Sequence, residues 1–90
     1  MGHVSEKKTK LLVRLRRIRG QVEAIERAVT ADEECAGVLQ QATSCRGALD
    51  GFIAEVIEDH IRERVVEAAD KASATQAAEE LIGIVRSYLT

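Results

Sequence analysis

An apolar seam in the first third of this chain constrains its fold more than any other feature. The seam residues recur at steps of 4, 3, 4, 3 and 4: Leu11, Leu15, Ile18, Val22, Ile25 and Val29. Such spacing places one apolar stripe on a helix, as at the a and d positions of bundled helices. We therefore predict a first helix over about residues 5–29, with Ser5 as N-cap and residues 1–4 as a mobile tail.

Two further helices are expected, and no proline interrupts the chain. Apolar residues at helical spacing predict a second helix over about 33–65, after a break in which Thr30 or Asp32 is the expected cap. A third helix is predicted over about 75–89, capped by Ser73 or Thr75. The connection between the first two helices is short and predicts an antiparallel hairpin. Residues 1–90 thus read as a single all-α domain, a three-helix protomer with a short third helix.

Cys35 and His60 lie 25 residues apart within the predicted second helix. At 3.6 residues per turn this is within about 20° of seven full turns, so both side chains share one stripe. A rise of 1.5 Å per residue nevertheless separates them by about 37 Å along the axis. They can share a ligand only across an antiparallel pair of helices, whose dyad would fall between Gly47 and Ala48. The spacing predicts a dimer with two shared sites, and oligomerisation would also stabilise so small a core.

The net charge of −2 conceals a basic first helix. Residues 1–27 carry eight Lys or Arg and three Glu, whereas residues 28–90 carry five cations and twelve acids. The cations of one helical stripe, with two that flank it, are Lys7, Lys10, Arg14, Arg17, Arg16 and Arg19. Cations without interleaved acids suit a phosphate backbone, and a solvated helix face is the alternative. The sequence has no zinc-finger spacing and no aromatic stacking platform for reading bases.

A thiolate and an imidazole together suit zinc, nickel, cobalt or copper, but two ligands are too few. Arg64, one turn after His60, cannot act as a ligand. Asp59 and Glu63 could instead orient the imidazole. His3, and the amine of Gly2 if Met1 is removed, are the other candidate ligands. The alternative is that Cys35 and His60 are ordinary core residues.

Cys45 and Arg46 lie near the proposed dyad. We interpret Cys45 as a packing residue, with a redox role as the alternative. Arg46 either pairs with Asp50, four residues on, or reaches the surface and extends the basic stripe.

Several classes of protein are excluded or disfavoured. The sequence has no nucleophile–base pair, no phosphate-binding Gly-rich loop and no catalytic carboxylate dyad, so we do not expect an enzyme. No apolar run approaches the length of a transmembrane helix. Nothing at the start resembles a signal peptide, so a reducing cytoplasm is expected.

Several segments resemble the CsoR/RcnR/FrmR repressors. The resemblance lies in Leu11–Arg27 (LLVRLRRIRGQVEAIER), Cys35, Val38–Gln41, Arg46–Ala48, Gly51, Ala54–Val56 and Asp59–Arg62. It implies an all-α protein that dimerises into an antiparallel four-helix bundle and assembles into a homotetramer, a dimer of dimers. It also implies a repressor that releases double-stranded operator DNA on binding copper, nickel or cobalt, or on reaction with formaldehyde.

The resemblance also assigns residues. Cys35 of one protomer and His60 of its partner would form the sensing pair, while Arg14, Arg17 and Arg46 would contact DNA. The family's fourth ligand position holds Cys in copper sensors and His in nickel and cobalt sensors, but here it is Arg64. This disfavours copper(I) and places the chain nearest the FrmR/RcnR branch.

The effector is left open by these residues. A formaldehyde sensor would need no metal, and the Gly2 amine could be bridged to the thiol by one carbon. The remaining alternatives are a thiol-redox or sulfur-species sensor using Cys35, with Cys45 as resolving thiol, and a non-sensing helical adaptor.

Overall fold

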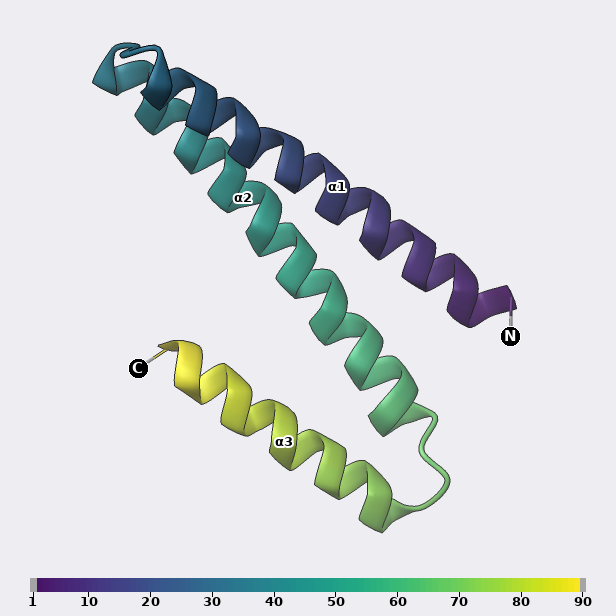
Figure 1. Cartoon of the computed structure of the whole chain (residues 1–90). Coiled ribbons are helices and arrows are strands. Elements are labelled where there is room, and N and C mark those ends of the chain that lie inside the picture. The colour runs from purple at the N-terminus through teal and green to yellow at the C-terminus, as the bar shows by residue number, and fades with distance from the viewer. Residues whose placement is uncertain (1, 90) are drawn as a thin grey trace. The chain divides into compact units, whose positions relative to one another are not determined.

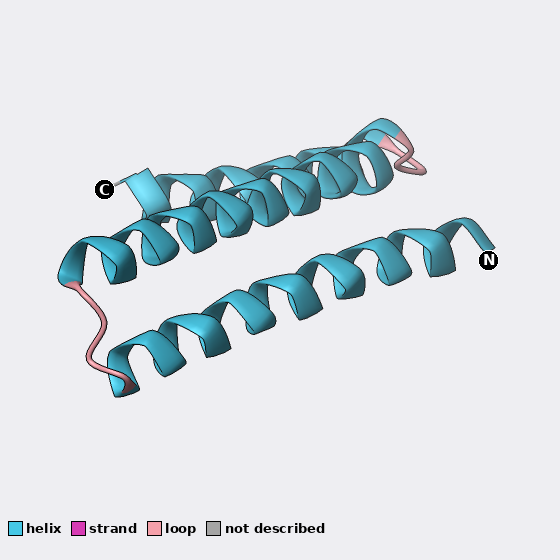
Figure 2. Cartoon of the chain, turned by 90° about the horizontal axis from the view of Figure 1, so that it is seen from above, coloured by secondary structure: helices cyan, strands magenta, loops and turns pink. Residues whose placement is uncertain are grey.

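The computed structural model describes the backbone of residues 2–89 and the side chains of residues 6–88. Its elements are α1 (Gly2–Thr30), α2 (Cys35–His60), the π-helical segment η1 (Ile61–Val66) and α3 (Lys71–Leu89) (Figure 1). Figure 2 shows that short loops join the successive helices. The described residues contain no strand. The prediction of an all-α, three-helix chain is therefore confirmed.

The chain divides into two compact units, residues 1–52 and 53–90. The first holds α1 and most of α2, and the second holds the end of α2, η1 and α3. Among the described residues, no helix is both long and apolar enough to cross a membrane.

The turn between α1 and α2 is closed by backbone hydrogen bonds. The N–H of Glu33 donates to the carbonyl of Ala28 (3.0 Å), and that of Asp32 donates to Val29 (3.1 Å). This is the Schellman pattern, which needs a left-handed residue after the helix, and Asp32 has φ of 55°. Our prediction that Thr30 or Asp32 caps α2 is therefore wrong. Asp32 instead ends α1, and the Thr30 hydroxyl donates back to Glu26 (2.9 Å).

The turn before α3 is closed by a side chain. The N–H of Ser73 donates to the Asp70 carboxylate (2.7 Å), and the N–H of Ala74 donates to the Asp70 carbonyl (3.1 Å). This is the geometry of an N-cap, so Asp70 takes the role predicted for Ser73 or Thr75. Because the cap lies earlier in the chain, α3 begins at Lys71 instead of residue 75.

The other helix boundaries also differ from the sequence-based ones. α1 already begins at Gly2, where a mobile tail was predicted, because extending an existing helix costs far less than nucleating one. The predicted second helix divides into α2 and η1, and it ends at Val66. Within η1, the N–H of Glu67 donates to the carbonyl of Arg62 (3.1 Å), five residues back, so the segment is wound more widely than an α-helix.

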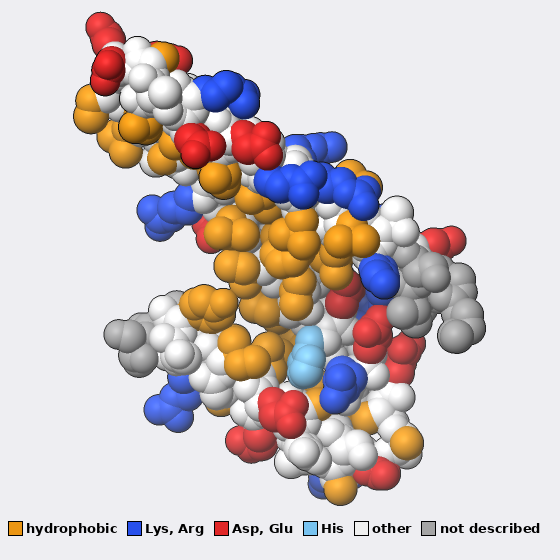
Figure 3. All heavy atoms as spheres, in the orientation of Figure 1, with side chains coloured by type: hydrophobic (Ala, Val, Ile, Leu, Met, Phe, Trp, Pro, Cys, Tyr) orange, Lys and Arg blue, Asp and Glu red, His pale blue; other side chains and the backbone are white. Residues whose placement is uncertain are grey.

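The protomer buries few side chains. Ile18, Ala28 and Ala77 are the buried hydrophobic residues of the described part. Ile18 belongs to the predicted apolar seam, but Val22 and Val29 of the same seam remain 52% and 58% exposed. Large hydrophobic side chains are also exposed on the later helices, among them Leu39 on α2 and Tyr88 on α3. In Figure 3, hydrophobic side chains gather over the middle of α2. A protomer packed this way leaves most of its apolar surface uncovered.

Candidate functional site

His60 is the last residue of α2, and its ring contacts α3. Its Nε2 lies 3.1 Å from the carbonyl oxygen of Ala77, a buried residue of α3. A carbonyl only accepts, so Nε2 must carry the proton that is donated. In the neutral ring the lone pair then resides on Nδ1, the atom that remains for a ligand. This backbone partner orients the imidazole in the way that outer partners orient metal-binding histidines.

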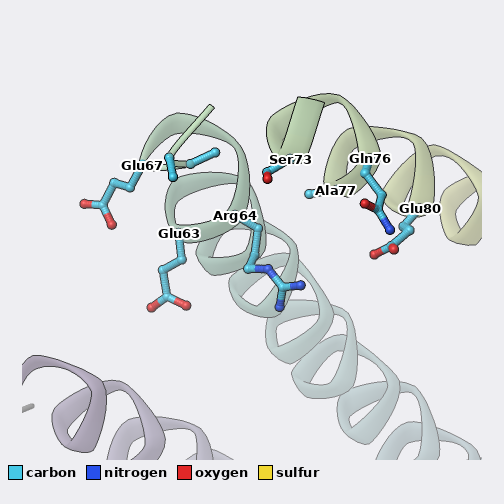
Figure 4. A pocket seen from close by; sticks show the side chains of 9 residues that line it. Glu63, Arg64, Glu67, Ser73, Gln76, Ala77 and Glu80 are labelled. Carbon is cyan, nitrogen blue, oxygen red and sulfur yellow. The ribbon is translucent and has the colours of Figure 1, made fainter. Parts of the chain in front are cut away.

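A polar cavity of about 390 Å³, which Ala77 also lines, lies between η1 and the start of α3. Figure 4 shows Glu63, Arg64 and Glu67 leaving η1, with Gln76 and Glu80 leaving α3. Arg64, the residue one turn after His60, lines this cavity together with Ala77. A guanidinium therefore stands where a further ligand would be expected. Of the two acids predicted to orient the imidazole, Glu63 borders this cavity beside Arg64, whereas Asp59 does not.

Cys35 is the first residue of α2 and is an exposed, free thiol. Cys45 is also free but partly buried, which fits its interpretation as a packing residue. Ten residues of helix separate the two Cα atoms by about 15 Å, beyond the roughly 7 Å that a disulfide tolerates. Cys45 therefore cannot act as a resolving thiol for Cys35 of the same protomer while α2 is intact.

The predicted effector residues are not assembled within one protomer. Cys35 belongs to the first unit and His60 to the second. Within the described part of the chain, no three His, Cys, Asp or Glu side chains are grouped so that they could hold a metal ion. The side chain of His3 lies outside the described residues, and Gly2 is the first residue of α1.

The basic stripe is solvent-exposed on α1. Lys7 is half-buried, and the exposed members are Lys10, Arg14, Arg16, Arg17 and Arg19. Figure 3 shows Lys and Arg side chains over α1. Arg19 approaches Glu23 at 3.9 Å, an exposed contact that contributes little to stability. Arg46 is exposed on α2 as well, as its predicted surface role requires.

Two features of the structure could not be predicted from the sequence. The Ala77 carbonyl is a backbone group, so its pairing with His60 depends on how α3 packs. In the first unit, the Gln21 side-chain oxygen is buried and has no hydrogen-bond partner among the described residues. It lies beside a cavity of about 150 Å³ that Ala24, Gln41 and Ser44 also line.

Comparison with known proteins identifies relatives along the whole chain. A protein of Serratia marcescens, described as uncharacterised in the bioA 5′ region, is 44% identical over 90 residues, covering 99% of both chains. The transcriptional repressor RcnR of Salmonella paratyphi B is 36% identical over 89 residues, also covering 99% of both.

Two solved structures share the fold. One is a variant of the formaldehyde-responsive regulator FrmR from Salmonella enterica serovar Typhimurium, with a TM-score of 0.86 and 38% identity, covering 92% of this chain and 94% of that one. The other is the copper-sensing repressor CsoR with Cu(I) from Geobacillus thermodenitrificans, with a TM-score of 0.88 and 26% identity, covering 94% and 88%.

The sequence model of the metal-sensitive transcriptional repressors matches residues 7–87. Members of this family are transcriptional repressors and not enzymes. With all three helices included in the match, the chain belongs to the CsoR/RcnR/FrmR family of metal-sensitive transcriptional repressors.

Proposed function

We propose that the chain is a transcriptional repressor that binds operator DNA and releases it when an effector engages the site formed by Cys35 of one protomer and His60 of the partner subunit. The observation that carries this proposal is the hydrogen bond from His60 Nε2 to the Ala77 carbonyl, which leaves Nδ1 as the ligand atom. The exposed thiol of Cys35 at the other end of α2 supplies the second group. Thiolate and imidazole are donors that suit a transition metal.

The assembly that we propose is an antiparallel dimer forming a four-helix bundle, and a dimer of such dimers. Cys35 begins α2 and His60 ends it, so antiparallel pairing of two α2 helices would bring each thiol to an imidazole of the partner. The exposed apolar side chains of α1 and α2, such as Val22 and Leu39, would be covered in this assembly. Covering them removes apolar surface from water, at roughly 25 cal/mol per Å².

The effector is either a transition metal or formaldehyde. Nickel, cobalt and zinc fit thiolate and imidazole donors, with His3 or the Gly2 amine completing the set, whereas Arg64 in the following turn disfavours copper(I). Formaldehyde would instead place one carbon between the Gly2 amine nitrogen and the Cys35 sulfur, with loss of one water. In that case Met1 must first be removed and no metal is required.

DNA would bind to the basic stripe of α1 together with Arg46 of α2. Exposed guanidinium groups that are not buried in ion pairs can neutralise phosphates and release counterions. The energetic link between this surface and the effector site would be a coupling free energy, commonly 1–3 kcal/mol. We expect the protein to work in the cytoplasm, where thiols stay reduced.

The test is a DNA-release titration. A duplex DNA is first selected from random sequence by repeated binding to the protein. Its complex with the protein is then titrated with nickel, cobalt, zinc, copper(I) and formaldehyde in separate experiments. Nickel, cobalt, zinc or formaldehyde should lower the affinity for this DNA at least about fivefold, the lower end of common allosteric coupling. Cys35→Ala and His60→Gln should abolish release while leaving effector-free affinity unchanged, and Cys45→Ala should behave like the unsubstituted protein. Normal release by Cys35→Ala would refute the mechanism.

A second candidate is a thiol-redox or sulfur-species sensor, which the exposed free thiol of Cys35 favours. In this case an oxidant or persulfide donor, and none of the metals or formaldehyde, would release the DNA. Mass spectrometry of the released protein would locate the modification on Cys35. Unmodified Cys35 after release would exclude this candidate.

A further inference from the structure

Arg14 of α1 lies over Gly51 of α2, and both belong to the first unit. A Cβ added to Gly51 would lie 2.7 Å from Nη1 of Arg14 and 3.9 Å from its Cζ. The first distance is too short for two non-bonded atoms, so the guanidinium occupies the space that any larger residue at position 51 would fill. The contact joins the basic helix to its neighbour at the tip of one predicted DNA-binding side chain.

The other glycines of this unit do not share this property. A Cβ added to Gly20, Gly37 or Gly47 would meet nothing within 4 Å. None of these positions has a positive φ, so backbone conformation does not require glycine at any of them. Glycine in a helix interior lowers stability relative to alanine. Of these four positions, Gly51 is the one at which an added Cβ would meet a neighbouring residue.

We propose that Gly51 is a positioning residue that seats the Arg14 guanidinium for contact with a DNA phosphate. Arg14 is an exposed residue, as a residue that contacts DNA must be. Holding the planar fork against α2 limits the side-chain freedom that would otherwise be lost on binding. This inference rests on the proposed function for the DNA contact. The contact between Gly51 and the Arg14 guanidinium, called the seat below, is a property of the free protein.

The seat can be tested without DNA. Gly51→Ala is compared with the matched control Gly37→Ala, an open position of α2 in the same unit and away from the proposed dyad. Both variants should fold. The new methyl displaces only the end of a flexible side chain in Gly51→Ala and meets nothing within 4 Å in Gly37→Ala. The Nε–Hε resonance of Arg14 in the ¹⁵N spectrum should shift in Gly51→Ala and stay in place in Gly37→Ala. An unmoved Arg14 resonance in Gly51→Ala would overturn the proposal.

Binding to the selected duplex then tests what the seat does. Gly51→Ala should weaken binding severalfold and lower the slope of log affinity against log salt by about 0.9, the value for one lost phosphate contact. Gly37→Ala should change neither quantity. In an Arg14→Ala background, Gly51→Ala should have no further effect on DNA binding, because Gly51 acts only through Arg14.

The outcomes separate the two proposals. A shifted Arg14 resonance with unchanged DNA affinity would refute the positioning role and leave the repressor proposal intact. Failure of the unsubstituted protein to bind any selected duplex would refute the DNA contact, and with it the positioning role, whatever the resonance does. An equal loss of affinity from Gly51→Ala with and without Arg14 would also overturn the proposal, since Gly51 would then act through another group.

Discussion

The two units of the chain differ in charge as well as in sequence position. Residues 1–52 contain nine Lys or Arg and seven Asp or Glu, whereas residues 53–90 contain four and eight. The first unit carries the basic stripe and Cys35. The second unit carries His60 and the glutamates that line the cavity beside η1. Attraction for a polyanion therefore belongs to the first unit, while the second would repel it. The proposed DNA contact and the proposed effector chemistry of His60 would thus involve separate parts of the chain.

The turns of the two units also differ in how they satisfy the backbone. The turn after α1 relies on main-chain hydrogen bonds and a left-handed Asp32. The turn before α3 relies on the Asp70 carboxylate, whose hydrogen bonds to Ser73 lower its pKa below the ordinary value of 3.8. A backbone turn does not titrate, whereas a carboxylate cap does. Acid should therefore loosen the second unit before it affects the turn of the first.

The largest expected effect comes from removing a cation of the first unit. Arg17→Ala should weaken binding to the selected duplex about tenfold and lower its salt slope by about one, because one charge-assisted phosphate contact is lost. Arg62→Ala is the matched change in the second unit, where the guanidinium pairs with Glu58 at 2.7 Å. It should leave DNA binding unchanged. Equal losses from both substitutions would contradict the division of roles between the units.

A smaller effect is expected from the Asp70 cap. Its lowered pKa means that the charged form is favoured by folding, so its contribution is present above the ordinary pKa and is lost as pH falls through the folded value. Asp70→Ala should lower the thermal midpoint at neutral pH and flatten its dependence on acid. Asp70→Asn, which keeps an acceptor but does not titrate, should retain more stability and also lose the acid dependence. Unchanged acid dependence in both variants would exclude Asp70 as its source.

The smallest effect is expected at Asp32. Glycine adopts a positive φ without steric cost, so Asp32→Gly should stabilise the fold by about 0.5–1 kcal/mol in urea denaturation. Asp32→Ala, which keeps the Cβ but loses the local polar group, should destabilise it. The change for glycine should be the same at acid and neutral pH, unlike that at Asp70. Destabilisation by Asp32→Gly would show that the carboxylate contributes more than the backbone conformation costs.

The sequence by itself determined the helical class, the antiparallel hairpin and the family. Heptad spacing from Leu11 to Val29 and the absence of proline are local properties, and local periodicity is sufficient to predict helices. The pairing of Cys35 with His60 across two copies is also a prediction from spacing, and it stays one. Cap positions were predicted poorly because several polar residues near a boundary compete for the same N–H groups.

Only the tertiary structure decided which of these competitors acts and what the site residues touch. Asp70 caps α3 instead of Ser73 because its carboxylate reaches the first free N–H groups of the helix. His60 is oriented by the Ala77 carbonyl, a backbone group that every residue possesses and no sequence pattern marks. Gly51 accommodates Arg14 because the packing of α1 against α2 brings them together across 37 residues of sequence. Contacts between elements depend on packing, and helical periodicity within one element does not specify them.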